Sequence, residues 1–162
     1  MTRIFLYALL IMFAATAAFA QPDPEARPFD SSANAQRDLD SALASNDDRN
    51  IIVILGANWC HDSRALAGWL TKPRFTEMLR DRYKTVYVDV GSPQTGQGRN
   101  LDIAKRFGIK KVKGTPLVMI VSPTGMLMNS RQDANSWRNA ASRSEDEIFA
   151  YFADFKPAKV RR

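Results

Sequence analysis

The chain reads IIVILGANWCHDSR over residues 51–64, and this stretch holds its only cysteine, Cys60, and its only histidine, His61. The β-branched apolar run at its start predicts a buried strand, and the residues from Cys60 to about Leu70 have the spacing of a helix. Cys60 is therefore expected at the first turn of that helix. Unpaired backbone N–H groups and the positive end of the helix dipole stabilise an anion there, which favours a nucleophilic thiolate. The alternative is that Cys60 is a small buried apolar residue.

Residues 1–20 have the pattern of an export signal. Arg3 gives a short positive start, residues 4–13 form an apolar core, and residues 18–20 are the small-residue ending of a signal-peptidase site. The apolar run is short for a transmembrane span, although a retained anchor is the alternative. The sequence thus predicts an exported protein, periplasmic or secreted, with no stable membrane anchor once the leader is cleaved. The proline-rich residues 21–32 are expected to form an extended linker.

The remainder, residues 33–162, has the size of one domain with a single core. The formal net charge of +6 is moderate and indicates solubility rather than a particular partner. An exported chain with one cysteine has no structural disulfide of its own, so its thiol is a reactive centre or pairs with another chain. Nucleic acid is not an expected partner, because basic residues interleaved with aromatic ones are lacking. The oligomeric state stays open.

Hydrophobic spacing, prolines and glycines predict the order of the elements. Helices are expected over 35–44, over 60–70, from Pro73, from a cap at Asn100 to Gly108, and from Ser144, where Glu147 completes a capping box. Buried strands are expected at 51–57, 86–90 and 117–121, with a short strand at 126–128 paired to the last of them. Residues 91–99 and 129–143 are expected to be irregular. Strands separated by helices require a largely parallel central sheet, and the final hairpin adds an antiparallel edge, so the predicted fold is α/β with helices on both faces.

In this order of elements the chain resembles the thioredoxin superfamily over nearly all of residues 33–162. The stretch Trp59-Cys60-His61-Asp62-Ser63 is a W-C-x-x-S version of the family's W-C-x-x-C motif. Phe107-Gly108-Ile109, followed by Gly114-Thr115-Pro116 and an apolar strand, is similar to the stretch that leads into the family's cis-proline loop. The strand–turn–strand–helix ending also matches. The resemblance implies a thioredoxin-like fold, in which a central mixed β-sheet is flanked by helices on both faces.

The resemblance also implies roles for single residues. Cys60 corresponds to the attacking cysteine and Trp59 to the aromatic residue that shields it. Pro116 corresponds to the cis-proline that faces the nucleophile, and Thr115 to the residue that offers backbone hydrogen bonds to a bound peptide. For Pro116, the alternative is an ordinary trans proline that opens a strand.

Two positions depart from the family's pattern. Ser63 stands where the resolving cysteine is expected, and Ile54 where thioredoxins commonly have a buried acid. Disulfide exchange passes through a mixed disulfide, and this chain has no second thiol to clear it. A self-contained dithiol cycle is therefore excluded. Cys60 can still attack a substrate disulfide, with a substrate thiol or an external thiol such as glutathione resolving the complex, or it can hold a partner as a stable adduct.

Several neighbours of Cys60 have two interpretations each. Ser63 Oγ either donates a hydrogen bond to the thiolate or is a tolerated polar residue in the first helical turn. His61 either favours the thiolate when protonated or is an exposed residue in the variable middle of the motif, which the sequence favours. One cysteine beside one histidine falls short of a zinc site, and neither a metal nor another cofactor is expected.

A group of basic residues precedes the expected cis-proline loop. Its members are Lys105, Arg106, Lys110, Lys111 and Lys113. They either attract acidic peptides or the carboxylates of glutathione toward Cys60, or they are the solvated end of a helix and its loop, which the sequence favours.

The leading hypothesis is an exported thioredoxin-like thiol–disulfide exchange protein that acts through Cys60 alone on protein thiols and disulfides. The first alternative is a non-catalytic module that keeps the peptide groove without the redox cycle, motivated by Ser63 and Ile54. A sensor whose Cys60 becomes oxidised is the second alternative. The sequence does not decide whether the protein is an enzyme.

Overall fold

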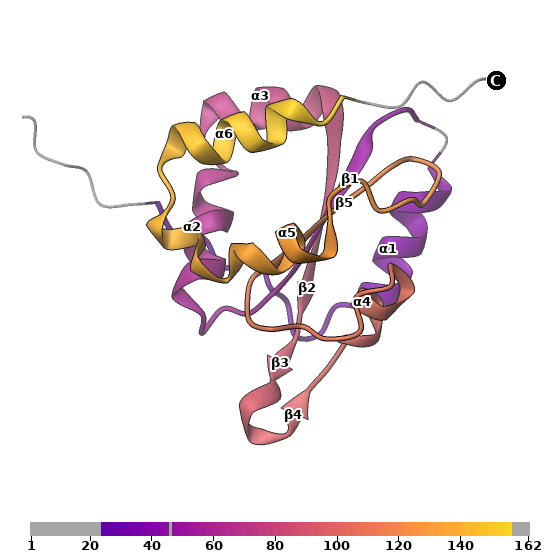
Figure 1. Ribbon diagram of the computed structural model, residues 1–162, viewed down its shortest axis with the longest axis vertical. Helices are drawn as coiled ribbons and strands as arrows, with labels where there is room; N and C mark the ends of the chain where they lie inside the picture. The colour runs from indigo at the N-terminus through magenta and orange to yellow at the C-terminus, as the bar shows by residue number, and fades with distance from the viewer. Residues whose placement is uncertain (1–23, 46, 157–162) are drawn as a thin grey trace, which may run out of the picture.

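The computed structural model describes residues 24–45 and 47–156 (Figure 1). The predicted export signal and the first residues of the predicted linker lie outside these ranges. Within them, no helix has both the length and the apolar character that a membrane span requires.

The described chain forms α-helices and strands, which are labelled in Figure 1, and short 3-10 helices. In chain order they are α1 (Ala35–Ala44), β1 (Asn50–Gly56), α2 (His61–Trp69), α3 (Pro73–Arg82), β2 (Tyr83–Asp89), β3 (Gly91–Ser92), η1 (Pro93–Thr95), β4 (Gln97–Gly98), α4 (Asp102–Arg106), β5 (Leu117–Val121), α5 (Arg131–Ser136), η2 (Trp137–Ser142) and α6 (Glu145–Asp154). The predicted α/β class is confirmed, and the predicted ranges of α1 and β5 agree with the structure.

The central sheet is mixed and has the strand order β2-β1-β5. β1 and β2 run parallel, with Asn50 opposite Tyr83, whereas β1 and β5 run antiparallel, with Ile51 opposite Val121. A parallel pair needs a crossover connection, and α2 and α3 provide it between β1 and β2. The mixed sheet that the resemblance implies is confirmed. The largely parallel sheet expected from the order of the elements is corrected, because β5 runs antiparallel to β1.

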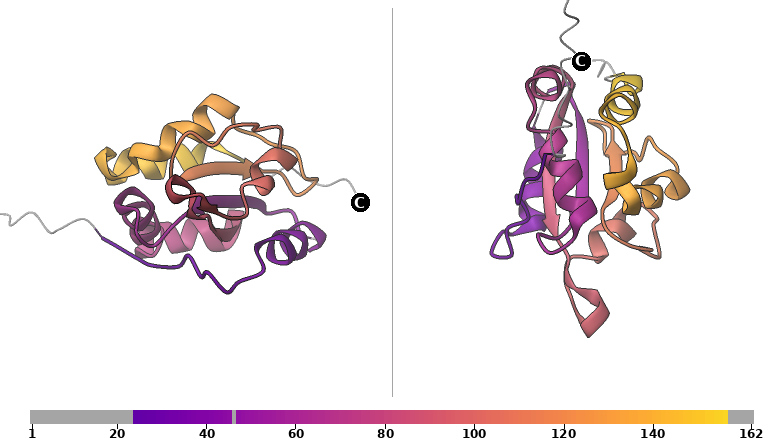
Figure 2. Two further views of the ribbon diagram at one scale, coloured as in Figure 1. Left: turned by 90° about the horizontal axis from the view of Figure 1, so that it is seen from below. Right: turned by 90° about the vertical axis from the view of Figure 1, so that its left-hand side faces the viewer.

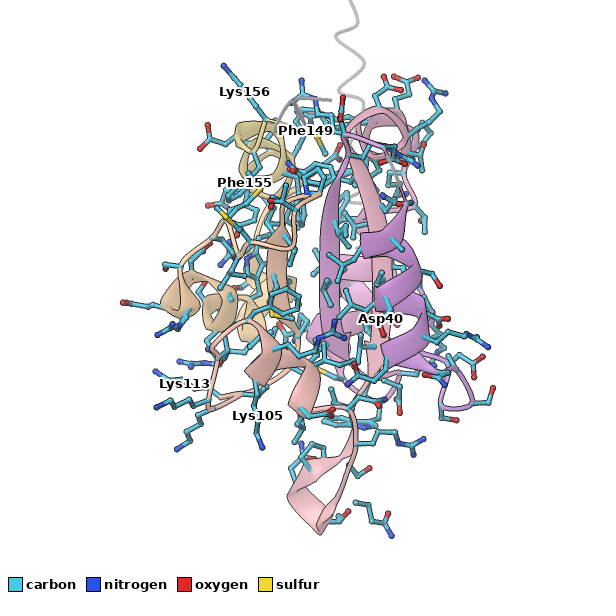
Figure 3. All side chains as sticks on the ribbon, turned by 90° about the vertical axis from the view of Figure 1, so that its right-hand side faces the viewer. Asp40, Lys105, Lys113, Phe149, Phe155 and Lys156 are labelled. Carbon is cyan, nitrogen blue, oxygen red and sulfur yellow. The ribbon has the colours of Figure 1, made fainter. Side chains whose placement is uncertain are left out.

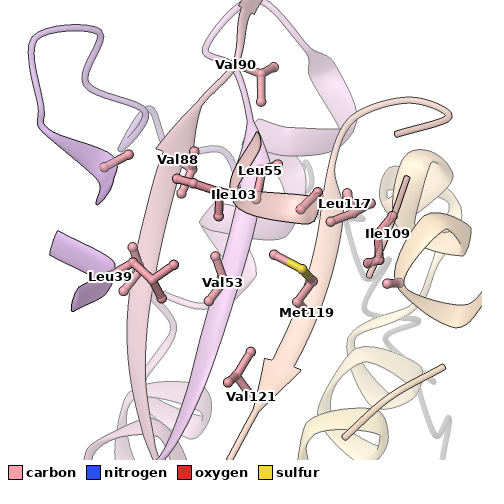
Figure 4. Packing of buried hydrophobic residues seen from close by; sticks show 14 of the residues in the cluster. Leu39, Val53, Leu55, Val88, Val90, Ile103, Ile109, Leu117, Met119 and Val121 are labelled. Carbon is pink, nitrogen blue, oxygen red and sulfur yellow. The ribbon is translucent and has the colours of Figure 1, made fainter. Parts of the chain in front are cut away.

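Both faces of β1 are buried, which explains why its sequence is apolar without alternation. Ile51, Val53 and Leu55 pack with α1 and α4 on one face (Figure 4), and Ile52 and Ile54 pack with α2, α3 and α6 on the other. Successive side chains of a strand point to opposite faces, so β1 contributes to two hydrophobic clusters. This arrangement fixes the end of β1, from which the chain enters the Cys60 turn.

The strand predicted at 126–128 is reduced to a single bridge between Leu127 and Val121. The physical reason is Asn129, whose side chain takes the place of further backbone pairing along β5. Its Oδ1 accepts a hydrogen bond from the Ile120 N–H at 2.9 Å, and its Nδ2 donates to the Val118 carbonyl at 2.9 Å. A buried amide thus caps part of the β5 edge.

Two segments predicted to be irregular contain regular structure. Residues 91–99 form the small β3–β4 hairpin around η1, which projects from the body of the molecule in the right-hand view of Figure 2. Residues 129–143 form α5 and η2, and Trp137 at their junction is wholly buried. These elements are too short and polar to show hydrophobic periodicity. The sequence signal that could have predicted α5 is its N-cap, where Ser130 Oγ accepts from the Asp133 N–H.

The helix caps agree with the sequence at α6 but not at α4. Ser144 and Glu147 form the predicted capping box of α6. Asn100 does not cap α4, because its backbone adopts φ 56° and its side-chain amide donates to the Asp89 carbonyl at 2.9 Å. Leu101 is the N-cap of α4 instead.

The predicted linker is also corrected where it is described. Residues 24–30, which we call the N-terminal strap, have no helix or strand but pack against the domain. Phe29 is buried with 2% of its surface exposed, and Gly68 of α2 leaves room for the strap, since a Cβ there would lie 2.2 Å from the Pro24 carbonyl oxygen. The Phe29 side chain thus helps to anchor this proline-rich segment to the domain.

Candidate functional site

Cys60 is the N-cap of α2, directly after the turn that leaves β1. Its backbone N–H donates to the Ala57 carbonyl at 3.0 Å, and its side chain makes no capping bond, so the thiol is available to other partners. The residue retains 9% of its surface and belongs to neither hydrophobic cluster. Its burial is that of the alternative, a small buried apolar residue, while its place at the start of α2 is the one predicted for a reactive thiol.

The loop before β5 lies against the Cys60 sulfur. The peptide bond between Thr115 and Pro116 is cis, and the thiol donates a hydrogen bond to the Thr115 carbonyl, with 3.3 Å between Sγ and the oxygen. Cys60 thus lies beside the Thr115–Pro116 peptide, more than fifty positions later in the chain, as the resemblance implies.

Trp59 precedes Cys60 and keeps 48% of its surface exposed. Its indole Nε1 donates to the Gly91 carbonyl at 2.8 Å, which ties the Cys60 turn to the base of the β3–β4 hairpin. A large aromatic side chain held this way remains available for contact with a partner chain.

Ser63 lies one helical turn after Cys60 and is completely buried. Its Oγ has no hydrogen-bond partner among the described residues, and it sits in a tight space beside Gly56 and the Phe29 ring. The hydroxyl makes no hydrogen bond to the Cys60 sulfur. Ser63 is a polar residue in the first turn of α2, as the second interpretation describes, but a buried one. Ile54 is buried among apolar residues, so the position of the family's acid is dry and uncharged.

His61 is exposed, in agreement with the interpretation that the sequence favours. Its Nδ1 lies 2.9 Å from Glu25 Oε1, so the ring contacts the strap rather than the Cys60 sulfur. The same carboxylate accepts a hydrogen bond from Arg64 Nε at 2.9 Å. The hydrogen bond from Arg64, followed by the contact with His61, lowers the pKa of Glu25 below its ordinary value. The same bond to Glu25 raises the pKa of Arg64.

The strap also holds the backbone of the Cys60 turn. Arg27 and Arg64 both donate from Nη1 to the Asn58 carbonyl, at 3.0 and 3.2 Å. The Asn58 side chain exchanges two hydrogen bonds with the backbone of Phe29, and the Ala26 N–H donates to the Arg64 carbonyl. Sequence reasoning missed this set, because no local pattern links the strap to residues about thirty positions or more away.

A second attachment fixes the first turn of α2 from the other side. Asp62 Oδ1 accepts a hydrogen bond from the Ala141 N–H at 2.9 Å, which joins α2 to η2. Among the residues that the structure describes, no group of three or more histidines, cysteines or carboxylates is placed to hold a metal ion.

A groove leads away from Thr115. It has a volume of about 300 Å³ and is lined mainly by apolar side chains of β2's end, the hairpin and the loop before β5, among them Val90, Pro93, Leu101 and Val112. Thr115, whose carbonyl accepts from the Cys60 thiol, belongs to this lining, whereas Cys60 itself does not.

Comparisons with known proteins agree with this geometry. A family model described as thioredoxin-like matches residues 34–123. The fold is similar to the crystal structure of a disulphide isomerase from Xylella fastidiosa Temecula1, with a TM-score of 0.70 and 28% sequence identity over 79% of this chain and 95% of that one. No curated protein sequence matches the chain.

Proposed function

Because the chain belongs to the thioredoxin-like family, we propose that it carries out thiol–disulfide exchange with Cys60 as its sole nucleophile. The observation that carries the proposal is the position of the Cys60 sulfur, at the N-terminus of α2 and 3.3 Å from the carbonyl of Thr115. The likeness to a disulphide isomerase supports the same chemistry.

In the proposed reaction, Cys60 loses its proton to solvent and the thiolate attacks one sulfur of a substrate disulfide. A bond forms between Cys60 Sγ and that sulfur, the substrate S–S bond breaks, and the second substrate sulfur leaves as a thiolate. The N–H groups of the first turn of α2 and its dipole stabilise the negative charge before the attack.

The second half of the reaction needs a thiol from outside the chain, because Ser63 supplies none. If another thiolate of the substrate attacks the mixed disulfide, the substrate leaves with a rearranged disulfide and Cys60 is regenerated. If a small external thiol such as glutathione attacks, the substrate leaves reduced and the external thiol becomes oxidised over two steps. The source of the resolving thiol thus decides between isomerisation, which has no net redox change, and monothiol reduction, which oxidises the external thiol.

The proposed substrate is a protein segment that lies along the cis-proline loop. Thr115 would offer its backbone to the segment, the exposed ring of Trp59 would cover one side of it, and the apolar groove would take a neighbouring side chain. The proposed compartment is outside the cytoplasm, periplasmic or secreted, where disulfides persist.

A second candidate function is a module that binds such segments without exchange. It is favoured by the buried, unpartnered Ser63 hydroxyl and by the apolar Ile54, since both remove groups that the dithiol members of the family use. The two candidates differ in one observable, which is whether captured partners are covalently attached to Cys60.

The experiment compares the full chain with its Cys60→Ser variant in the native compartment. Thiols are quenched with an alkylating agent, and captured proteins are separated without reductant and identified by mass spectrometry. Ser63→Ala is the matched control, because it removes the neighbouring hydroxyl and keeps the sulfur. We expect covalent adducts with the natural chain and with Ser63→Ala and none with Cys60→Ser. Equal capture by all three would instead support the binding module.

A further inference from the structure

The net positive charge of the protein comes from one part of the chain. From Ile103 to Gln132 the sequence has six lysines and arginines and no aspartate or glutamate, although the chain as a whole has 17 acidic residues. One of the six, Arg106, is neutralised by α1, since its guanidinium lies 2.8 Å from Asp40 Oδ1 and donates to Gln36. The other five define what we call the basic face: Lys105, Lys110, Lys111, Lys113 and Arg131.

None of the five takes part in an ion pair within the described ranges 24–45 and 47–156. Figure 3 shows Lys105 and Lys113 extending into solvent from the same side of the molecule. Like charges held together without counter-ions repel one another, and an acidic partner relieves that repulsion.

The backbone beneath the basic face is fixed by a buried amide. Asn135 Oδ1 accepts a hydrogen bond from the Lys113 N–H at 2.8 Å, and its Nδ2 donates to the Arg131 carbonyl at 2.9 Å. Lys110, Lys111, Lys113 and Arg131 thereby surround a hollow of about 500 Å³. The loop and the start of α5 therefore present their cations from a common scaffold.

The loop before β5 joins the basic face to the residue whose carbonyl accepts from the reactive thiol. Lys113 lines both this hollow and the apolar groove, and Thr115, two residues later, lines the groove and accepts from the Cys60 thiol. A chain seated in the groove with its disulfide at Cys60 would pass Lys113 on its way outward. The groove favours a polypeptide over a nucleic acid as the occupant, because its lining is mainly apolar and includes no aromatic residue on which bases could stack.

We propose that the basic face selects substrate segments that carry acidic side chains beside the disulfide that Cys60 attacks. The inference rests on the proposed function and adds its substrate class. Complementary charge acts mainly on the rate of encounter and on specificity, so acidic segments are captured faster than neutral ones and the advantage fades with added salt.

The test measures binding apart from exchange. The full chain with Cys60→Ser is titrated into a fluorescent peptide in which serine replaces the reacting cysteine and several glutamates flank it. A second peptide, identical except that glutamines replace the glutamates, is titrated in the same way. Lys110→Gln, Lys111→Gln and Lys113→Gln are combined in the test variant. Lys72→Gln, Arg80→Gln and Lys156→Gln form the matched control, which removes the same charge elsewhere; Figure 3 shows Lys156 at the opposite end of the molecule.

We expect the glutamate peptide to bind about tenfold more tightly than the glutamine peptide at low salt, with the difference lost in the test variant and kept in the control. Equal binding of the two peptides, or equal loss in both variants, would overturn the inference. Tighter binding of a DNA duplex, with displacement of the glutamate peptide, would also overturn it, because the face would then be a general polyanion surface.

A second measurement separates this inference from the proposed function. The natural chain reacts with the glutamate and glutamine peptides, each carrying its cysteine as a mixed disulfide with thionitrobenzoate, and release of the coloured thiolate reports the attack. Attack on both peptides with a preference for the acidic one supports both proposals. Release from neither peptide would refute exchange, and the binding titration would still decide whether the basic face prefers acidic segments.

Discussion

Cys60 lies between two segments that use their charges in opposite ways. On the strap, Glu25 is satisfied by Arg64 and His61, and Arg27 donates to the Asn58 carbonyl, so every charge near the Cys60 turn has a partner within the domain. The charges of the basic face, which lie on the loop before β5 and on the neighbouring helices, have no ion-pair partner among the described residues. The strap is therefore built as part of the scaffold, whereas the loop keeps its charge for a partner outside the chain.

The two segments also differ in packing. The strap buries Phe29 against Gly56 and beside the ring of Tyr87, at 5.5 Å between ring centroids. The loop buries Pro116 but leaves Lys110 and Lys111 exposed. Substitutions in the strap should consequently change stability, and substitutions in the loop should change recognition.

The largest expected effect comes from Ser63→Cys, which places a thiol at the enclosed position between Cys60 and the strap. An intramolecular thiol should clear a mixed disulfide on Cys60 at least about a hundredfold faster than an external thiol does, since attack within one molecule is no longer limited by encounter. The lifetime of the adduct with a small disulfide, followed by mass spectrometry, measures this. An unchanged lifetime would mean that the buried position cannot reach the sulfur. Ser63→Ala should leave the lifetime unchanged.

The next effect concerns the strap as a structural element. Phe29→Ala should lower the free energy of unfolding by about 3–5 kcal/mol, because it leaves a cavity beside Gly56. Urea unfolding followed by tryptophan fluorescence measures this, with the exposed Met126→Ala as the control. The combined glutamine variant of Lys110, Lys111 and Lys113 should change stability by no more than about 0.5 kcal/mol. If Phe29→Ala lowered the free energy of unfolding by no more than the triple lysine variant does, the strap would not be more important for stability than the loop.

The smallest effect is expected from Glu25→Gln and depends on pH. The hydrogen bond from Arg64 lowers the pKa of Glu25 from its ordinary value of 4.5. A carboxyl whose pKa is lowered by folding stabilises the fold above its unfolded pKa, and this contribution is lost as the pH falls through the lowered value. The variant should thus be less stable than the natural chain at neutral pH and equal to it in strong acid.

Urea midpoints at neutral and acid pH test this, with Glu77→Gln as a matched control that also removes one exposed carboxylate. No ion pair of Glu77 is found among the described residues. A constant difference between Glu25→Gln and the natural chain at all pH values would show that the ion pairs of Glu25 do not stabilise the strap.

The sequence was sufficient for the parts of the molecule that depend on local pattern. The apolar run of β1, the proline at the start of α3 and the capping box of α6 each express their structure within a few residues. The placement of Cys60 at a helix N-terminus follows from the same signals.

The rest depended on contacts that no local pattern encodes. A proline-rich segment has the same composition whether it is a free linker or a docked strap, and only the fit of Phe29 against Gly56 decides between them. The burial of Ser63 follows from that contact. The separation of Arg106 from the basic face likewise required α1 to lie beside α4. Long-range packing therefore determined which of the predicted site residues are buried or paired within the domain and which are open to a partner.

The most direct test is the reaction of the folded, reduced chain with a peptide disulfide at neutral pH, followed by intact mass spectrometry. Thiol–disulfide exchange through Cys60 predicts a single adduct whose mass increase equals one half of the peptide disulfide, and its loss in Cys60→Ser. No adduct on the folded chain, under conditions in which the urea-unfolded chain forms one, would contradict it, because the sulfur would then be closed to substrates by the fold itself.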